Sequence, residues 1–220
     1  MKQLNLTDGA IECLKYSAAI LMLLDHVNKY LLNGSSYILF CVGRISLPIF
    51  AFVFAYNLAR PIPNPITRYI GTLKKLLAFG ILATPAYVLL GTIYFCWPLN
   101  VLFMFLVATA TLYFKEIKRP ALSILLFVVG GFFVEWWWLG AGLVIAFWGW
   151  FKNTTSKSSV YVLMMLVSLS IINQNLYALA ALPVIALLSK CNINIPRMKY
   201  FFYWFYPAHL SIIYLLKSVI

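Results

Sequence analysis

Residues 14–32 read LKYSAAILMLLDHVNKYLL, an apolar run that ends in a short polar segment. Its length matches the ~20 residues that an α-helix needs to cross the hydrocarbon core of a bilayer. Eight further apolar runs follow it along the chain. The sequence therefore predicts an all-α fold, a polytopic bundle of transmembrane helices.

The composition supports this fold class. Hydrophobic residues make up 64% of the 220 residues, charged residues make up 10%, and the mean hydropathy is +0.91. A soluble domain is about half apolar and about a quarter charged. The composition excludes a soluble enzyme, a disulfide scaffold, a disordered chain and a DNA-binding domain. We therefore expect the lipid bilayer as a partner and no nucleic acid, although the formal net charge is +12.

The runs predict about nine spans in a single domain, residues 1–220, with little room for a soluble domain. The middle runs are short and form two pairs, 120–151 and 159–189. Each pair is either two thin spans or a re-entrant hairpin, which is tolerated where protein or a cavity covers its backbone. The runs cover residues 14–32, 36–57, 69–91, 93–114, 120–135, 136–151, 159–172, 175–189 and 201–219.

The basic residues predict the orientation. If the N-terminus is cytoplasmic and the spans alternate, only Lys29 and Lys217 lie outside and Arg44 lies within a span. Basic residues accumulate on the cytoplasmic side of membrane proteins, so this split predicts an N-in, C-out topology. The cytoplasmic set is Lys2, Lys15, Arg60, Arg68, Lys74, Lys75, Lys115, Lys118, Arg119, Lys152, Lys157, Lys190, Arg197 and Lys199.

The ionisable residues inside apolar runs are the candidates for chemistry, since each costs ~2.5–3.5 kcal/mol at the centre of a membrane helix. Asp25 and His26 point about 100° apart, so Asp25 does not easily orient its neighbour. His26 shares a helix face with Lys15, ~16 Å away along the axis. The pair is either a polar contact that fixes helix packing or a catalytic or proton-handling site.

Arg44 and His209 lie within other runs. Arg44 needs an anion, which is either Asp25 on the preceding helix or the carbonyl or phosphate of a ligand. His209 is either a packing residue or a functional one.

Glu135 is either an interfacial residue or the partner of a histidine. Three asparagines near span ends are expected to cap or cross-link helices: Asn57, Asn100 and Asn175. No metal site is expected, and the cysteines are interpreted as apolar fillers: Cys13, Cys41, Cys96 and Cys191.

Two stretches carry a resemblance to a known family. The run from Lys15 to Asn28 is similar to the first span of TraX-type membrane proteins. The run from Gly43 to Phe52, followed by Asn57-Leu58-Ala59-Arg60, resembles their second span. Weaker similarities continue in order towards the C-terminus, at 100–103, 140–143 and 201–210.

The resemblance implies a membrane acetyltransferase that acts in F-type conjugation. It implies acetyl transfer from cytosolic acetyl-CoA, as co-substrate, to the N-terminal amine of a pilin in the bacterial inner membrane. Larger membrane acyltransferase families carry a basic residue, ten residues and then a histidine in their first span, and Lys15 and His26 have this spacing. The small size and the lack of an extracytoplasmic domain are departures from those families.

The residues suit such a reaction, which needs a base and donors for an oxyanion. We expect His26 to be the base and Asp25 to position Arg44 or His209. The oxyanion would be stabilised by Arg44 or by a backbone or asparagine N–H. Lys15 would meet a coenzyme A phosphate. Arg44 and Arg60 complete the candidate residues for acetyl-CoA, and both direct transfer and an acetyl-histidine remain open.

Three alternative functions remain open. An O-acetyltransferase acting on a surface glycan would need the same base. A proton-coupled transporter would also use buried Asp, His and Arg residues. A non-catalytic assembly partner would tolerate apolar residues in place of Asp25, His26 and Arg44.

Overall fold

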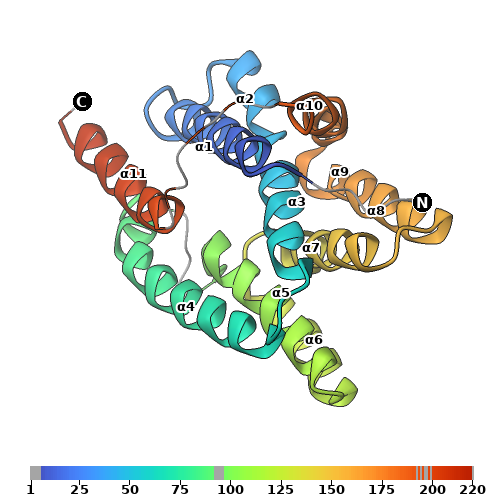
Figure 1. The fold of residues 1–220 in the computed structure, drawn as a ribbon. Helices are drawn as coiled ribbons and strands as arrows, with labels where there is room; N and C mark the ends of the chain where they lie inside the picture. Colours follow the sequence, from blue (N-terminus) through green and yellow to red (C-terminus); the bar gives the residue numbers. More distant parts are fainter. Residues whose placement is uncertain are drawn as a thin grey trace.

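Every regular element of the computed structural model is a helix within the residues that it describes, which are 6–91, 97–191, 193, 195, 198 and 200–219 (Figure 1). Cys96, Lys2, Arg197 and Lys199 lie outside them. The elements are α1 (Asp8–Tyr30), α2 (Tyr37–Gly43), α3 (Ser46–Ala59), α4 (Pro65–Leu89), α5 (Val101–Glu116), α6 (Pro120–Phe133), α7 (Trp137–Lys152), α8 (Ser156–Ser168), α9 (Ser170–Asn173), η1 (Tyr177–Ala180), α10 (Ala181–Leu188) and α11 (Phe201–Lys217).

The helices have membrane character. Three described stretches are long and apolar enough to cross a membrane: Tyr37–Ala59, Pro65–Leu89 and Ser156–Asn173. Two others, Pro120–Phe133 and Tyr177–Leu188, are apolar but shorter. The all-α membrane class is confirmed, whereas the count of about nine spans and the N-in, C-out orientation stay predictions.

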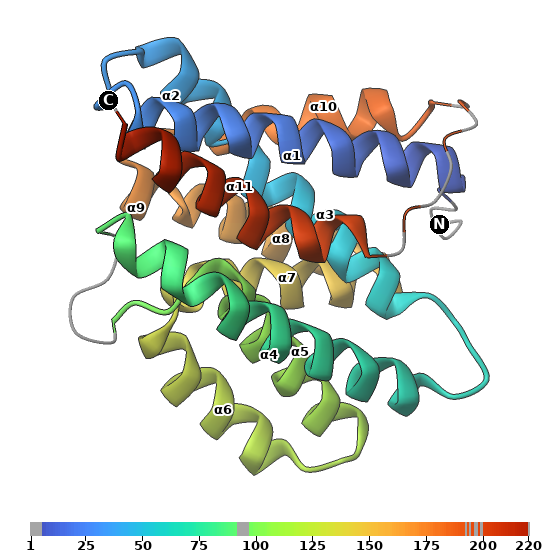
Figure 2. The ribbon, with the colours of Figure 1, turned by 90° about the vertical axis from the view of Figure 1, so that its left-hand side faces the viewer.

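The long helices lie side by side and alternate in direction. Figure 2 shows that α1, α4 and α11 begin at the end of the bundle where α3 ends. At the opposite end, α1 ends close to α2 and to the last turn of α11. The two ends of the bundle therefore carry different sets of helix termini.

One predicted span begins in the wrong place. The run 93–114 was expected to be helical throughout, but α5 begins only at Val101. Leu99 instead forms an isolated bridge with Val134, and Asn100 caps α5 by accepting a hydrogen bond from the Leu102 N–H at 3.1 Å. Backbone pairing of this segment with the end of α6 replaces the helix, and residues 93–96 lie outside the described part of the chain.

The predicted second span is broken at its most polar point. The chain leaves α2 after Gly43 and enters α3 at Ser46, so Arg44 lies at the break and not inside a continuous helix. Pro48 in the first turn of α3 has no N–H to donate, which is tolerated at a helix start. The break places the Arg44 side chain between helices.

Each short pair forms separate helices. The chain breaks between α6 and α7 at Val134–Trp136, and after α9 at Gln174, where φ is 56°. This excludes one long helix through either pair.

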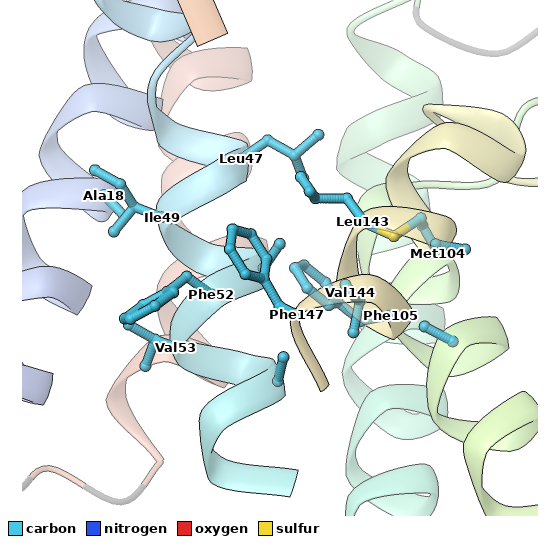
Figure 3. Packing of buried hydrophobic residues seen from close by; sticks show 14 of the residues in the cluster. Ala18, Leu47, Ile49, Phe52, Val53, Met104, Phe105, Leu143, Val144 and Phe147 are labelled. Carbon is cyan, nitrogen blue, oxygen red and sulfur yellow. The ribbon is translucent and has the colours of Figure 1, made fainter. Parts of the chain in front are cut away.

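The core is centred on α3, which packs between α1 and α7. In Figure 3, Ile49 of α3 faces Ala18 of α1, while Phe52 lies against Phe147 of α7. The rings of Phe52 and Phe147 meet edge to face with centroids 5.4 Å apart. The packed α1–α3–α7 layer leaves the other faces of α1 and α3 for the site described next.

Candidate functional site

A cavity of about 1050 Å³ runs along α1 and α3 and is also lined by α4, α5 and α11. One end, here the basic end, is defined by Lys15, Arg60, Arg68 and Lys75. The other, the tryptophan end, is defined by Trp136, Glu135 and Lys29. Lys15 and Lys29 are separated by ~21 Å along the helix axis, so the cavity extends through most of the bundle.

The two histidines of the chain meet at this cavity. His26 of α1 lies against His209 of α11, with Nδ1 of His26 2.7 Å from Nε2 of His209. The two rings are nearly parallel, at 5°, and their centroids are 5.0 Å apart. His26 lines the cavity and His209 is buried behind it. The sequence predicted both as candidates but not that they touch.

The hydrogen bonds assign the tautomers. Nδ1 of His209 is 2.8 Å from the carbonyl oxygen of Phe205, which can only accept, so this nitrogen carries the proton. In a neutral ring, Nε2 of His209 then accepts a hydrogen bond from Nδ1–H of His26. Nε2 of His26 is left with a free lone pair and has no hydrogen-bond partner among the described residues. His26 therefore presents a base to the cavity.

Arg44 forms the second polar centre. Its guanidinium is paired with the carboxylate of Asp25, as one of the two sequence interpretations expected, and Nη1 also donates to Oδ1 of Asn173 at 3.4 Å. The guanidinium lies over Phe40 and Trp136, 4.7 and 5.8 Å from their ring centres. Nε of Arg44 is buried without a hydrogen-bond partner in the described part of the chain.

A glycine makes this ion pair possible. A Cβ built on Gly43 would collide with the Asp25 carboxylate. Without a side chain at this position, α2 can approach α1 closely enough for Arg44 to reach Asp25. No hydrogen bond joins Asp25 to His209 among the described residues, and Asp25 is paired with Arg44 instead.

The basic end gathers cations from several elements. Lys15 is paired with the buried Glu12, at 2.7 Å, and Arg60 is 3.5 Å from Asp8. Lys75 lies over the rings of Tyr200 and Tyr203, at 5.6 and 5.8 Å, and has no carboxylate partner among the described residues.

Arg68 has a structural task at the same end. Its Nη1 donates to three carbonyl oxygens at the C-terminus of α3, those of Asn57, Leu58 and Arg60. Such a contact satisfies carbonyls that a helix end leaves free. The three residues predicted to bind acetyl-CoA, Lys15, Arg44 and Arg60, all line the cavity. Two further cytoplasmic basic residues, Arg68 and Lys75, line it as well.

Several other predicted features are placed by the structure. Asn100 caps α5, which confirms its predicted role, and Oδ1 of Asn175 accepts a hydrogen bond from the Tyr177 N–H at 3.1 Å, just before η1. Glu135 lines the cavity and makes no hydrogen bond or ion pair with either histidine in the described residues. The Sγ atoms of Cys13 and Cys191 are 3.3 Å apart, a contact that the sequence did not suggest.

Comparisons with known proteins agree over most of the chain. A family model described as TraX protein matches residues 10–217. A curated relative, Protein TraX of Escherichia coli, is 35% identical over 129 residues, which cover 56% of this chain and 48% of the relative. The match thus spans about half the length of that relative. No solved structure matches the chain.

Proposed function

The chain belongs to the TraX family, and on that premise we propose that it is an acetyltransferase of the bacterial inner membrane. It would move an acetyl group from cytosolic acetyl-CoA to the N-terminal amine of a membrane-inserted pilin. The observation that carries the proposal is the His26–His209 pair, which presents one unprotonated ring nitrogen to a cavity with cations at one end.

The basic end suits the phosphates of acetyl-CoA. Lys75 has no carboxylate partner in the described part of the chain. Arg60 is paired with Asp8, whose carboxylate is exposed to solvent. Lysine and arginine side chains are the usual partners of phosphate oxygens. The apolar part of the cavity wall includes Phe50, Phe54 and Phe202. A long, narrow pantetheine arm fits such a passage, and Lys15 stands ~16 Å from His26 along the axis of α1.

The residues then divide the reaction between them. The free amine of the acceptor attacks the thioester carbonyl carbon, and Nε2 of His26 takes the proton that the amine loses. His209 accepts a hydrogen bond from Nδ1–H of His26 and so supports the imidazolium that forms. Arg44, whose Nε–H has no partner in the described part of the chain, stabilises the oxyanion. When the carbon–sulfur bond breaks, His26 returns the proton to the sulfur, leaving an N-acetyl group and the free thiol of coenzyme A.

The length of the cavity suggests that the two substrates enter from opposite ends. Acetyl-CoA would enter at the basic end and the acceptor at the tryptophan end. The same base could serve a glycan hydroxyl, so an O-acetyltransferase remains the alternative for the acceptor.

One observation favours a second function class. A cavity that extends through most of the bundle and is lined by Asp25, His26 and Arg44 is also what a proton-coupled transporter would use. A transporter would move protons with a solute and would not consume acetyl-CoA.

Radiolabelled acetyl-CoA separates these functions. The purified chain in lipid nanodiscs is incubated with labelled acetyl-CoA and an apolar peptide with a free N-terminus. We expect label in the peptide with the wild type and with Glu116→Gln, a control distant from the cavity and paired with Lys152. We expect none with His26→Gln. No label in any acceptor, with proton flux in vesicles, would establish the transporter instead.

A further inference from the structure

We propose that Glu135 and the tryptophans around it form the subsite that binds the acceptor as a primary ammonium ion, and thereby select an amine over a hydroxyl. The inference rests on the proposed function and names the substrate class of its acceptor. It starts from a second, smaller hollow of about 390 Å³ at the tryptophan end.

The small hollow touches the main cavity through Glu135. Glu135 and Trp136 line both spaces, and Trp97 and Trp137 complete the aromatic wall of the small one. The ring centroids of Trp97 and Trp137 are 6.1 Å apart, and the ring planes are inclined by 27°. Aromatic faces together with a carboxylate are the chemistry that recognises an ammonium group in proteins.

Glu135 differs from every other acidic residue of the chain. The sequence holds five acidic residues. Four of them are paired with a cation, Asp8 with Arg60, Glu12 with Lys15, Asp25 with Arg44, and Glu116 with Lys152. Glu135 has no ion pair among the described residues. A carboxylate that lines a cavity without a cation is available to a cation that enters.

Burial raises the pKa of Glu135, while several neighbouring groups favour its charged form. The N–H of Val101, at the start of α5, donates to Glu135, and a helix N-terminus favours a negative charge. Lys29 and Arg44 attract the carboxylate from a greater distance and Asp25 repels it. Arg44 is held by Asp25, and Lys29 lies over the ring of Tyr30 at 4.9 Å. These four charges cancel, so an ammonium ion would meet little repulsion.

The backbone around Glu135 is held in an unusual conformation. Trp136 and Trp137 have φ values of 65° and 48°, in the left-handed region that bulky residues rarely adopt. Two backbone hydrogen bonds hold the turn, from Leu99 N–H to Phe133 and from Glu135 N–H to Leu99, both at 2.7 Å. Strain of this kind persists where the fold requires a particular direction of side chains. Here the turn places Glu135 and Trp136 where they line both the main cavity and the small hollow.

An ammonium ion in this subsite would also be prepared for the transfer. The hydrogen bonds to Glu135 would hold the nitrogen at the cavity. Transfer of one ammonium proton to the Glu135 carboxylate would yield the free amine, which passes a second proton to His26 as it attacks the thioester. A hydroxyl carries no charge, so it would gain little from the carboxylate or from the aromatic faces.

Two peptides test the subsite independently of catalysis. One has a free α-amine, and the other has an α-hydroxyl in the same position; binding of each to the full chain in nanodiscs is measured by calorimetry. We expect the wild type to bind the amine about tenfold more tightly. Equal affinity of the wild type for both peptides would overturn the proposal, whatever the variants do.

The variant Glu135→Gln sharpens this result. We expect it to bind the amine as weakly as the hydroxyl peptide, while Glu116→Gln keeps the preference. A Glu135→Gln chain that folds and retains the tenfold preference contradicts the proposal. If Glu135→Gln fails to fold, Glu135→Asp, which keeps the charge, should still prefer the amine, and loss of the preference in that variant would count against it. Absence of acetyl transfer by the wild type would refute the proposed function but leave the binding comparison intact.

Discussion

The two ends of the cavity differ in how their charge is held. At the basic end, cations come from the first helix, from the loop after α3 and from α4, and two of them are already matched by carboxylates. At the tryptophan end lies Glu135, a carboxylate with no ion pair among the described residues, directly before two residues in the left-handed region. Several cations suit a polyanion, whereas one carboxylate suits a single small cationic group. The histidine pair lies between the two.

The largest effect is expected at the histidine pair, which lies between the two ends of the cavity. Replacing His26 by Gln removes the base, which is worth about 10²–10⁴-fold in rate. Single-turnover transfer from labelled acetyl-CoA measures the change, with the KM for acetyl-CoA as control. A rate within twofold of wild type would show that His26 is not the base.

The ion pairs at the two ends should differ in strength. Asp25→Ala leaves the largely buried guanidinium of Arg44 without its anion, and we expect a loss of about 3–5 kcal/mol in the free energy of unfolding. The matched change at the basic end, Asp8→Ala, breaks a half-exposed pair at 3.5 Å and should cost less than about 1 kcal/mol. Steric-trap unfolding in bicelles measures both. Equal losses would contradict the contrast between the ends.

The close approach of α1 and α2 predicts a smaller loss of stability. In Gly43→Ala the new methyl group meets the Asp25 carboxylate, and we expect about 1–3 kcal/mol of destabilisation in the same assay. Gly71→Ala is the control, because a Cβ there meets no atom within 4 Å and should stabilise α4 by up to about 1 kcal/mol. The interpretation fails if both substitutions change stability in the same direction.

The smallest effect is expected at the basic end. Lys75→Ala should raise the KM for acetyl-CoA about three- to tenfold, and the effect should shrink at high salt because the contact is electrostatic. Lys152→Ala, which breaks a pair with Glu116 outside the cavity, should leave this KM unchanged. An identical KM in the two variants would remove Lys75 from the phosphate site.

Local patterns in the sequence predicted much of the fold. The apolar runs located most helices within a few residues, because a span is defined by consecutive side chains. The shared face of Lys15 and His26 was also readable, and both line the cavity. The i, i+3 spacing of Glu12 and Lys15 is also a local signal, because residues three apart are neighbours on a helix surface, although the sequence analysis did not predict this ion pair.

The remaining features depend on tertiary contacts. His26 and His209 are 183 residues apart, and no local pattern indicates that their rings meet. The left-handed turn at Trp136 and Trp137 contradicts local preference, since bulky residues avoid positive φ. The late start of α5 arises from backbone bonds between Leu99 and the end of α6.

The central claim is that an acetyl group passes from the basic end to an amine at the tryptophan end. It is tested most directly in vesicles that hold the protein in one orientation, with acetyl-CoA and a membrane-impermeant amino peptide placed on the same side or on opposite sides. The account predicts acetylated peptide when the two substrates are on opposite sides, with acetyl-CoA facing the basic end. Acetylation only when both are on the same side would contradict it.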